Sequence, residues 1–438
     1  MTRRPAAGRW DARLALAAGT AALLLPLVYA GLRSLVLVAA GLAGIAVAAA
    51  GVWWVLARTG AIRALALVPA VVAPIAVVAL YAAYGLLWVA VVSVLLWALA
   101  GSSARAALAR QTAPEEARER RGAPARRPFL IMNPRSGGGK VGAFGLVEKA
   151  EALGAQVLVL DPAHPQDVAE LARRAVDDGA DLLGVAGGDG TQAAVAEVAA
   201  ARRVPFLVIP AGTRNHFAMD LGLDRQDPAA ALEALTDGVD LEVDLGFAGE
   251  RVFVNNASFG AYAAVVQSPA YRDDKARTTL RMLPEILTHQ RGPHLVLRAG
   301  PAVVDAPQAV LVSNNPYRTG DPAGLGLRVR LDSGLLGVLA VKVDNAAQAA
   351  GMLRGAHSSG LSRLTARDVV VEAHSPTVPV GVDGEALTLP APVRCRIAAG
   401  ALRVRVPRNR PGVPRAKPAL DWHRVRRLAG TAGRTARG

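Results

Sequence analysis

The chain has 438 residues, of which 52% are hydrophobic, and a formal net charge of +15. This length is sufficient for two or three folded units with separate apolar cores, which argues against a single domain. The only cysteine, Cys395, excludes an intrachain disulfide and a zinc site built from several thiolates. The basic charge does not predict a nucleic-acid partner, because no basic motif interleaved with aromatic residues accompanies it.

The first hundred residues have the composition of membrane-spanning helices. They contain one acidic residue, Asp11, and five of the six tryptophans. The uncharged stretches 14–32 and 35–56 are each long enough for one span, and 64–100 is long enough for two spans with a turn near 81–85. Residues 1–101 are therefore predicted to form four transmembrane helices. The apolar region is too long for a signal peptide, and buried helices of a soluble protein are the second alternative.

Basic residues in the short flanking loops predict the orientation of these helices. Arginines precede the first span, separate the second from the third and follow the fourth, whereas the opposite loops carry only Arg33. The positive-inside rule assigns the arginine-rich loops to the cytoplasm. We therefore expect a multi-pass protein of the cell membrane. Both chain ends, and the region that follows the fourth helix, are expected to be cytoplasmic.

Two basic segments border the region that follows the helices. Residues 102–127 form a juxtamembrane linker, and residues 407–438 form a tail that we expect to be disordered. Both segments are expected either to lie against anionic lipid head groups or to remain solvated.

Residues 128–240 alternate short apolar runs with amphipathic stretches, which predicts βαβ units around a parallel sheet. In such sheets ligands bind beyond the carboxyl ends of the strands. The loops that follow three of the strands are therefore the candidate binding site. The predicted strands are 129–132, 156–160, 182–186 and 205–209, and the predicted helices are 141–153, 165–178 and 191–201.

The first of these loops, 133–140, has three consecutive glycines followed by Lys140. Residues without a β-carbon let backbone N–H groups approach phosphate oxygens closely. The loop is not a Walker A motif, because Val141 stands where that motif requires serine or threonine. A flexible turn without a ligand is the alternative.

The second loop, 187–191, reads GGDGT and lies between a predicted strand and a predicted helix. This position directs free N–H groups and the positive end of the helix dipole toward an anion. Asp189 would repel a bare phosphate, so its presence indicates a divalent cation or a substrate hydroxyl between the two. A turn with purely structural glycines is the alternative.

The third loop, 210–218, again follows a strand directly. Gly212 permits close approach, and Thr213 and Asn215 offer neutral side chains suited to a nucleotide or a phosphate. His216 is expected to be a loop residue and not a base.

Together and in this order, the three loops resemble those of the diacylglycerol kinase catalytic family, which includes sphingosine kinases and bacterial lipid kinases. NAD kinases share the GGDGT loop and a related fold, so the combination of GGDGT with PxGTxNxFA is the more specific sign. The resemblance covers residues 128–407. It implies an α/β fold of the NAD kinase/diacylglycerol kinase type with two lobes.

The first lobe is expected to be an ATP-binding parallel α/β domain over 128–240. The second, over 241–406, is expected to be rich in antiparallel strands, because short runs of valine and leucine alternate there. Its last strands are expected to return to the first domain. In this family the active site lies in the cleft between the lobes.

The second lobe contains the sequence Asp383-Gly384-Glu385, which resembles a motif of the family. The resemblance implies that Glu385 is the general base for a lipid hydroxyl and that Asp383 supports it. With Asp189 they are the candidate catalytic residues. The alternative is a D-G hairpin turn between two strands.

The resemblance also implies ATP and Mg²⁺, with Asp189 as a candidate metal ligand. The family has a second, structural Mg²⁺ near a D-D-G-type turn, where this chain has Ser333 after Asp332, so only Asp332 is a candidate ligand there. The candidate ATP-binding residues are Asn133, Ser136, Gly137, Gly138, Gly139, Lys140, Gly187, Gly188, Asp189, Gly190, Thr191, Gly212, Thr213 and Asn215.

These features together predict a membrane-bound kinase that transfers the γ-phosphate of ATP to a hydroxyl of diacylglycerol or a related lipid. Two alternatives stay open. One is a kinase for a soluble substrate, of the NAD kinase type, and the other is a membrane protein that binds a nucleotide without catalysis.

Overall fold

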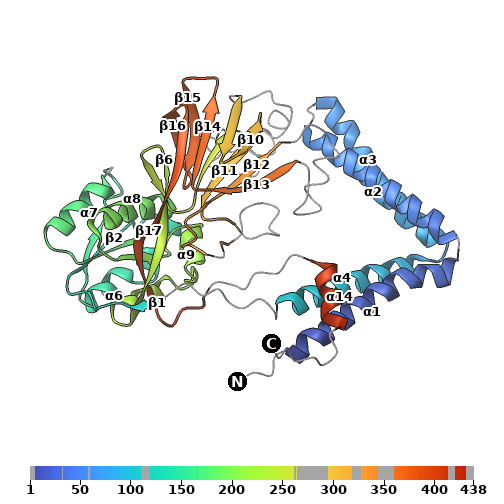
Figure 1. The fold of residues 1–438 in the computed structure, drawn as a ribbon, viewed down its shortest axis with the longest axis horizontal. Helices are drawn as coiled ribbons and strands as arrows, with labels where there is room; N and C mark the ends of the chain where they lie inside the picture. The colour runs from blue at the N-terminus through green and yellow to red at the C-terminus, as the bar shows by residue number, and fades with distance from the viewer. Residues whose placement is uncertain are drawn as a thin grey trace. The chain divides into compact units, whose positions relative to one another are not determined.

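The structure is a computed structural model of the chain, and it divides into two compact units (Figure 1). One unit contains the N-terminal helices and a C-terminal helix, and the other contains the strands. The residues that the structure describes are 5–31, 33–57, 60–109, 119–164, 166–260, 263, 294–317, 327–328, 330–342, 360–412 and 420–430.

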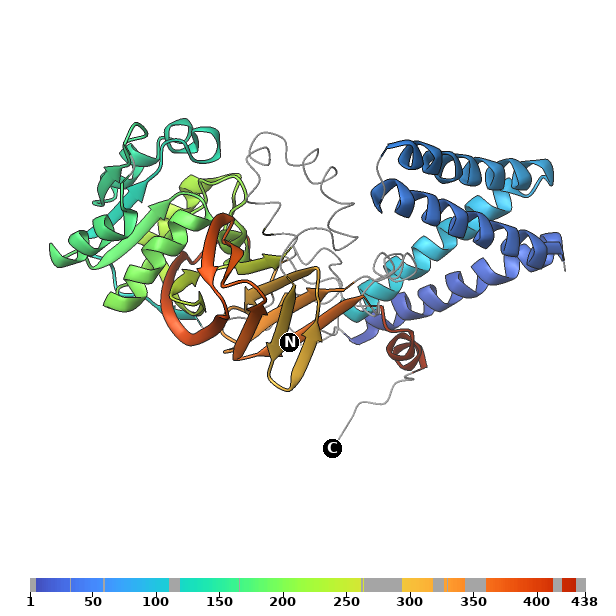
Figure 2. The ribbon, with the colours of Figure 1, turned by 90° about the horizontal axis from the view of Figure 1, so that it is seen from above.

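Four long helices form most of the first unit: α1 (Pro5–Ala30), α2 (Arg33–Ala57), α3 (Gly60–Ala83) and α4 (Leu87–Ala109). Each contains an apolar stretch of 20 to 23 residues, long enough to cross a membrane. The predicted four spans are thus confirmed as helices of the required length and composition. The turn between α3 and α4 includes Gly85, at φ +67°, inside the predicted window. In Figure 2, α1 lies along α4 and α2 lies along α3.

The basic tail 407–438 was expected to be disordered, yet the structure has helix α14 (Trp422–Gly430) there. Val425 is fully buried in an apolar cluster with the N-terminal part of α1 and the C-terminal part of α4. Figures 1 and 2 show α14 lying crosswise to these two helices. The cluster consists of Ala12, Ala15, Ala104, Ala107, Leu108 and Val425.

Two local features explain why this part of the tail is helical. Asp421 accepts a hydrogen bond from the backbone N–H of Arg424 at 3.0 Å, as an N-cap residue does. Trp422, Val425 and Leu428 recur at helical spacing and share one face. The basic composition of the tail, taken alone, does not reveal this amphipathic pattern. Residues 413–419 and 431–438 of the predicted tail, and 110–118 of the predicted linker, lie outside the described residues.

The second unit is built on a mixed sheet whose centre is parallel. The strands β2 (Pro128–Met132), β3 (Gln156–Val159), β4 (Leu182–Ala186) and β5 (Phe206–Ile209) pair in the order β3-β2-β4-β5. All of these pairs are parallel, as predicted. The long strand β17 (Val393–Pro407) lies next to β5 and parallel to it, so the chain does return to the first lobe.

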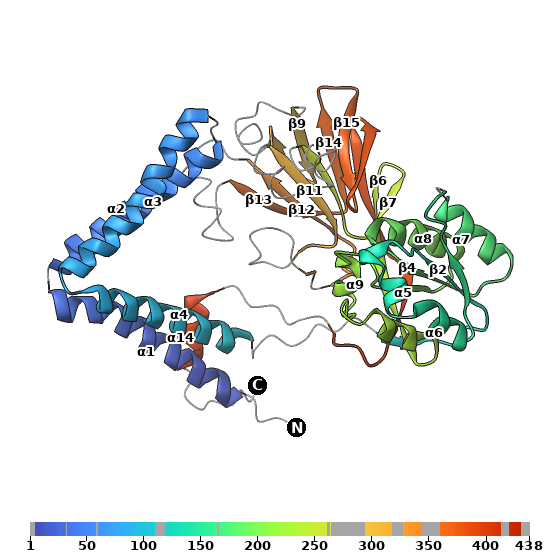
Figure 3. The ribbon, with the colours of Figure 1, turned by 180° about the vertical axis from the view of Figure 1, so that it is seen from behind.

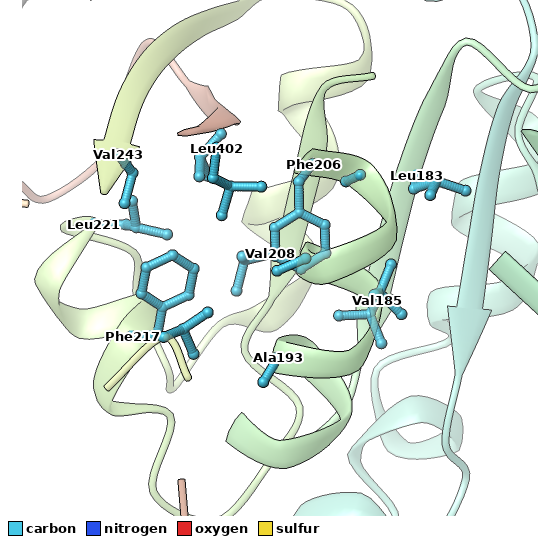
Figure 4. Packing of buried hydrophobic residues seen from close by; sticks show 14 of the residues in the cluster. Leu183, Val185, Ala193, Phe206, Val208, Phe217, Leu221, Val243 and Leu402 are labelled. Atoms are coloured by element: carbon cyan, nitrogen blue, oxygen red, sulfur yellow. The ribbon is translucent and has the colours of Figure 1, made fainter. Parts of the chain in front are cut away.

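Helices cover both faces of this parallel region. Successive strand residues alternate between two buried clusters, as period-two side-chain direction requires. One cluster packs against α7 (Val168–Asp177) and α8 (Asp189–Arg202), and Figure 4 shows its centre around Val185, Phe206 and Val208. The other packs against α5 (Lys140–Ala143), α6 (Leu146–Ala152) and η2 (Pro228–Leu235). The predicted helix 141–153 is divided in two because Gly145 is left-handed, at φ +57°.

The second lobe is rich in antiparallel strands, as predicted. A six-stranded antiparallel sheet has the order β13-β12-β11-β8-β15-β16, and β9, β10 and β14 extend the first sheet. A third buried cluster fills the space between the two sheets. The strands are β1 (Glu119–Arg121), β6 (Gly238–Ala248), β7 (Arg251–Phe253), β8 (Asn256–Gly260), β9 (Leu295–Ala299), β10 (Ala302–Asp305), β11 (Ala309–Asn314), β12 (Leu336–Val341), β13 (Leu361–Ala366), β14 (Asp368–Ala373), β15 (Thr377–Val382) and β16 (Glu385–Pro390).

Candidate active site

The first glycine loop leaves the end of β2 and forms a short 3-10 turn, η1 (Ser136–Gly138), before α5. The backbone N–H of Asn133 donates to the carbonyl of Ala186, at the end of β4, at 2.9 Å. The side-chain oxygen of Asn133 accepts from the N–H of Arg135 at 3.0 Å. Asn133 therefore fixes the shape of its own loop and attaches it to the second one. The three glycines that follow have φ values of +58°, +78° and +89°, which L side chains rarely adopt.

The three loops are in direct contact at the carboxyl ends of β2, β4 and β5. A β-carbon on Gly137 would overlap the carbonyl oxygen of Ala211 in the third loop. A β-carbon on Gly212 would lie 2.7 Å from the Cα of Gly188 in the second loop. Glycine at positions 137 and 212 is thus what permits the loops to converge. Figure 3 shows α5, α8 and α9 (His216–Asp220), which follow the loops, near β2 and β4.

The second loop ends at the first turn of α8. Gly188 is the N-cap residue and Asp189 is the first residue of the helix, so the N–H groups of this turn have no acceptor within the helix. A β-carbon on Gly188 would meet no described atom within 4 Å, so there is open space beside this N-cap residue. A helix start of this kind is a typical phosphate-binding position, and that role stays a prediction here.

A buried glutamine that is not among the predicted site residues supports the second loop. Gln192 has 0% exposure, and its Nε2 donates to the carbonyl of Gly187 at 3.1 Å. No local pattern distinguishes this glutamine from a surface residue of α8. Its role depends on the way the helix packs.

The side chain of Asn215 serves the third loop itself. It is fully buried, its backbone is left-handed at φ +53°, and its Oδ1 accepts from the N–H of Gly212 at 3.0 Å. Its Nδ2 donates to the carbonyls of Gly212 and Pro210 at 2.6 and 3.1 Å. The amide that we expected to contact a ligand is therefore occupied within the loop. Thr213, in contrast, is exposed at the loop surface.

Asp189 connects the second loop with the start of α9. Its carboxylate faces the backbone N–H groups of His216 and Phe217, each at 3.4 Å. Burial lowers the pKa of the His216 imidazole, and the charges of Asp189 and Asp220 only partly oppose this effect. His216 is the first residue of α9 and is half-buried.

Lys140 lies at the edge of the site. Its Nζ donates to the backbone carbonyl of Arg225 at 2.7 Å, and its Cδ lies 3.2 Å from the position of a β-carbon on Gly137. The aliphatic part of Lys140 thus lies beside the first loop, and its ammonium group binds the segment that follows α9.

The Asp383-Gly384 sequence is a two-residue hairpin turn between β15 and β16, in which Val382 pairs with Glu385. Both turn residues have positive φ, +47° and +88°, as a type I′ turn requires. This turn also brings Glu385 to the second loop, since its carboxylate occupies the space that a β-carbon on Gly190 would need. The hairpin turn and the position of Glu385 beside the second loop therefore occur together, and the catalytic role of Glu385 stays a prediction.

Asp383 holds the chain between β7 and β8. Its carboxylate accepts from the backbone N–H groups of Val254, Asn255 and Asn256 at 2.7, 2.9 and 3.0 Å. Burial raises the pKa of this carboxyl to about 7, and the charge of Asp189 adds to the effect, whereas the N–H donors oppose it. The carboxylate thus faces protein N–H groups and orients the turn that carries Glu385.

The predicted metal ligand Asp332 is paired with a basic side chain. Asp332 is bound by the guanidinium of Arg330, at 2.8 and 3.1 Å. The buried carboxylate of Asp244 instead holds the turn, because it accepts from the N–H groups of Gly334 at 2.6 Å and Gly400 at 2.8 Å. The predicted metal ligand Asp332 thus has a basic partner in this structure, and a cation at this turn stays a prediction.

No three histidine, cysteine or acidic side chains form a metal-binding group within the ranges that the structure describes. A nucleotide-linked Mg²⁺ does not require one, because this ion commonly binds one or two carboxylates together with substrate phosphates. Asp189, beside the open N-terminus of α8, fits that arrangement.

Comparison with known proteins identifies the domain that contains the three glycine loops. Residues 127–248 match the diacylglycerol kinase catalytic domain. A diacylglycerol kinase of Mycobacterium tuberculosis is 27% identical over 297 residues, which is 64% of this chain and 94% of the relative. A Pseudomonas aeruginosa protein named among the YegS-like lipid kinases is 28% identical over 298 residues, 65% of this chain and 95% of the relative.

The fold is also that of solved structures. A crystal structure of a Bacillus anthracis protein assigned as a diacylglycerol kinase superposes with a TM-score of 0.52 at 20% identity, and covers 65% of this chain and 98% of its own. The chain therefore contains a diacylglycerol kinase catalytic domain, and its enzyme class is that of the lipid kinases. It is membrane-associated through four apolar helices.

Proposed function

We propose that this protein is a membrane-bound, ATP-dependent kinase that transfers the γ-phosphate to a hydroxyl of diacylglycerol or a related lipid. One observation carries the proposal: three glycine loops touch one another at the ends of parallel strands, with the carboxylate of Glu385 beside Gly190. The match to the diacylglycerol kinase catalytic domain and the four apolar helices support the proposal.

When bound, Mg²⁺-ATP supplies the phosphoryl group and a cation that neutralises its charge. The N–H groups at the start of α8 and in the first loop would hold the phosphates. Asp189, half-buried at the helix start, would hold the cation. Thr213, exposed on the third loop, is available to the nucleotide.

Glu385 is the candidate base. Its side chain is exposed, so a lipid hydroxyl can reach it, and it lies over the loop that receives the phosphates. A carboxylate in this position can accept the proton that the hydroxyl loses as it attacks phosphorus. Asp383 supports this role by fixing the hairpin turn two residues earlier.

The test is to incubate the full-length protein in mixed micelles with labelled ATP and a total lipid extract, and to identify the labelled product by mass. We expect one lipid class to carry the label. Glu385→Gln should lower kcat by about 100-fold or more, which is typical for loss of a general base. Glu151→Gln, an exposed carboxylate on α6, is the control and should match the wild type.

Two results would contradict the proposal. Phosphorylation of NAD without any lipid would favour the soluble-substrate kinase. ATP binding without a labelled product from any lipid would favour a nucleotide-binding protein without catalysis. Full activity of Glu385→Gln would contradict the role of Glu385 as the base, but not the proposal of a lipid kinase.

We further propose that the site is cytoplasmic. Arg9 and Arg13 lie near the start of the first candidate span and Arg63 near the start of the third, which are membrane ends on the same side, where the positive-inside rule expects cytoplasmic arginines. The buried Cys395 makes a direct test possible, because burial raises the pKa of its thiol to about 12 and suppresses its reaction. An exposed Glu250→Cys should react with an impermeant maleimide in inverted vesicles and not in intact cells. The reverse pattern would overturn this orientation.

The basic segments are proposed to contact anionic lipid head groups. On α14 the apolar face packs against α1 and α4, while Arg424, Arg426 and Arg427 are exposed. The α1 and α4 contacts lie within a few residues of the ends of the candidate spans, which is the depth of an interfacial helix. Each basic residue there contributes about 1 kcal/mol toward an anionic surface.

Amide hydrogen exchange over 422–430 in lipid nanodiscs tests this contact. Exchange should be slower in phosphatidylcholine containing about 30% phosphatidylglycerol than in phosphatidylcholine alone, and the difference should shrink with salt. Equal exchange in the two bilayers would contradict the proposal.

A further inference from the structure

Two almost completely buried charged side chains have no part in the transfer described above: Arg328 and Asp220. The Nε and the backbone N–H of Arg328 both donate to the carboxylate of Asp220, each at 2.7 Å. Asp220 is the last residue of α9, the helix that follows the third loop. Arg328 is therefore attached directly to the nucleotide side of the site.

The rest of the guanidinium holds the segment between β7 and β8. Nη1 donates to the carbonyls of Val254 at 2.6 Å and Asn314 at 2.7 Å, and Nη2 donates to the side-chain oxygen of Asn255 at 2.9 Å. The same segment gives its N–H groups to Asp383. It is thus held from its carbonyl side by Arg328 and from its N–H side by Asp383.

We propose that Arg328 is a positioning residue that fixes Glu385 relative to the third glycine loop. The contacts form one continuous series of hydrogen bonds, buried at Arg328 and partly buried at Asp383, that ends two residues before Glu385. In order, the series is Asp220, Arg328, Val254, Asn255 and Asp383. The inference rests on the proposed function, because it assigns Arg328 an effect on the candidate base.

The geometry explains why the residue is arginine. All three side-chain nitrogens of Arg328 are used, by acceptors from three different parts of the chain. Lysine has one nitrogen on a flexible stem and cannot reproduce a planar fork. In-line phosphate transfer depends on alignment of nucleotide and acceptor, so a shift of about 1 Å at a remote support costs on the order of 100-fold in rate.

The test compares Arg328→Gln with Arg405→Gln in the full-length protein. Arg405 is also buried and is paired with Asp240, and it donates to the carbonyl of Ala123 at 2.9 Å. It lies beside Leu207 near the start of β5, whereas the loops follow the strand ends. Arg405→Gln therefore controls for the loss of a buried ion pair away from the site.

Both variants should unfold at a lower temperature than the wild type. At a temperature where both are folded, only Arg328→Gln should lower kcat, by about tenfold to 100-fold, with the KM for ATP changed less than about threefold. Arg328→Lys should fall between Arg328→Gln and the wild type. If Arg328→Gln does not fold, Arg328→Lys and Asp220→Asn provide the same comparison.

Amide hydrogen exchange over 254–256 is the second readout, and it does not need activity. Exchange there should be faster in Arg328→Gln and unchanged in Arg405→Gln. A kcat for Arg328→Gln within about twofold of the Arg405→Gln value, or equal exchange over 254–256, would overturn the inference. A wild-type protein that phosphorylates no lipid would overturn the proposed function, and the exchange rates would still test the structural link.

Discussion

The glycines of this site have two functions. They allow the chain to turn, and they leave space for neighbouring residues. The space beside Gly190 is occupied by the carboxylate of Glu385, and the space beside Gly212 by the side chain of Asn215 and the backbone of Gly188. Gly188 itself has open space where a β-carbon would lie. The same residue type thus serves packing between loops at one position and access for a ligand at another.

Gly190→Ala should separate the placement of Glu385 from the stability of the fold. The added methyl would displace only the flexible end of Glu385, so the unfolding free energy should change by no more than about 1 kcal/mol. We expect kcat to fall at least about tenfold, because the base is moved. Enzyme assays with thermal unfolding measure both quantities. Gly142→Ala, in α5 and with open space around it, is the control and should leave kcat unchanged.

The raised pKa of Asp383 predicts a pH dependence of stability. Its pKa is about 7 in the folded protein, chiefly through burial, and about 3.9 in an unfolded chain. Between these values the folded state holds a proton that the unfolded state has released. The contribution of this carboxyl is therefore complete below about pH 4 and is lost as the pH rises through about 7.

Unfolding of the wild type and of Asp383→Asn at about pH 5 and pH 8 measures this effect. The amide cannot titrate, so the wild type should lose about 1–4 kcal/mol more than the variant between the two pH values. Parallel pH dependence of the two proteins would place the pKa of Asp383 below this window.

Among the elements, helix α14 shows how a short amphipathic sequence obtains a defined position. Asp421 caps it, Val425 is buried against α1 and α4, and Arg13 Nε donates to the carbonyl of Ala429 at 3.3 Å. A helix of nine residues is marginal by itself in water, so this packing is what stabilises it.

Val425→Asp should release α14 from the membrane unit. A charge in the apolar contact loses its hydration, and the helix is too short to persist alone. Trypsin should then cleave at Arg424, Arg426 and Arg427 much faster than in the wild type, as mass spectrometry of micelle samples will show. Leu420→Asp, at an exposed position just before the helix, should not change the rate.

For the whole molecule, the catalytic unit is joined to the membrane unit at both of its ends. The two ends meet, since Arg410 Nη2 pairs with Glu119 at 2.6 Å. The N–H of Gly412 donates to the carbonyl of Gly222, just after α9, at 3.1 Å. Glu119 and Arg410, near the two described ends of the catalytic unit, therefore lie side by side, and Gly412 is bound to Gly222 in the turn after α9.

A protein limited to residues 115–414 should fold, because the three buried clusters around its sheets lie within it. We expect its kcat on a dispersed short-chain diacylglycerol to be within about threefold of the full-length value. On long-chain lipid in vesicles it should be at least about tenfold slower, because the anchor raises the effective concentration of enzyme at the surface. Equal rates on vesicles would show that the helices do not contribute to substrate access.

The sequence by itself determined the features that depend on local patterns. A span of 20 to 23 apolar residues is visible in the chain, and β4 has the predicted bounds, 182–186, residue for residue. The order of glycine loops after parallel strands also follows from local sequence, because parallel strands place their carboxyl ends at one edge.

Only the tertiary structure decided which side chains face a ligand and which hold the protein together. Asn215 is bound within its own loop, Asp332 to Arg330, and Asp383 to N–H groups up to 129 positions earlier. The pairing of Arg328 with Asp220 spans 108 positions. The partners of a polar group depend on which distant segments pack around it, and no local pattern records that choice.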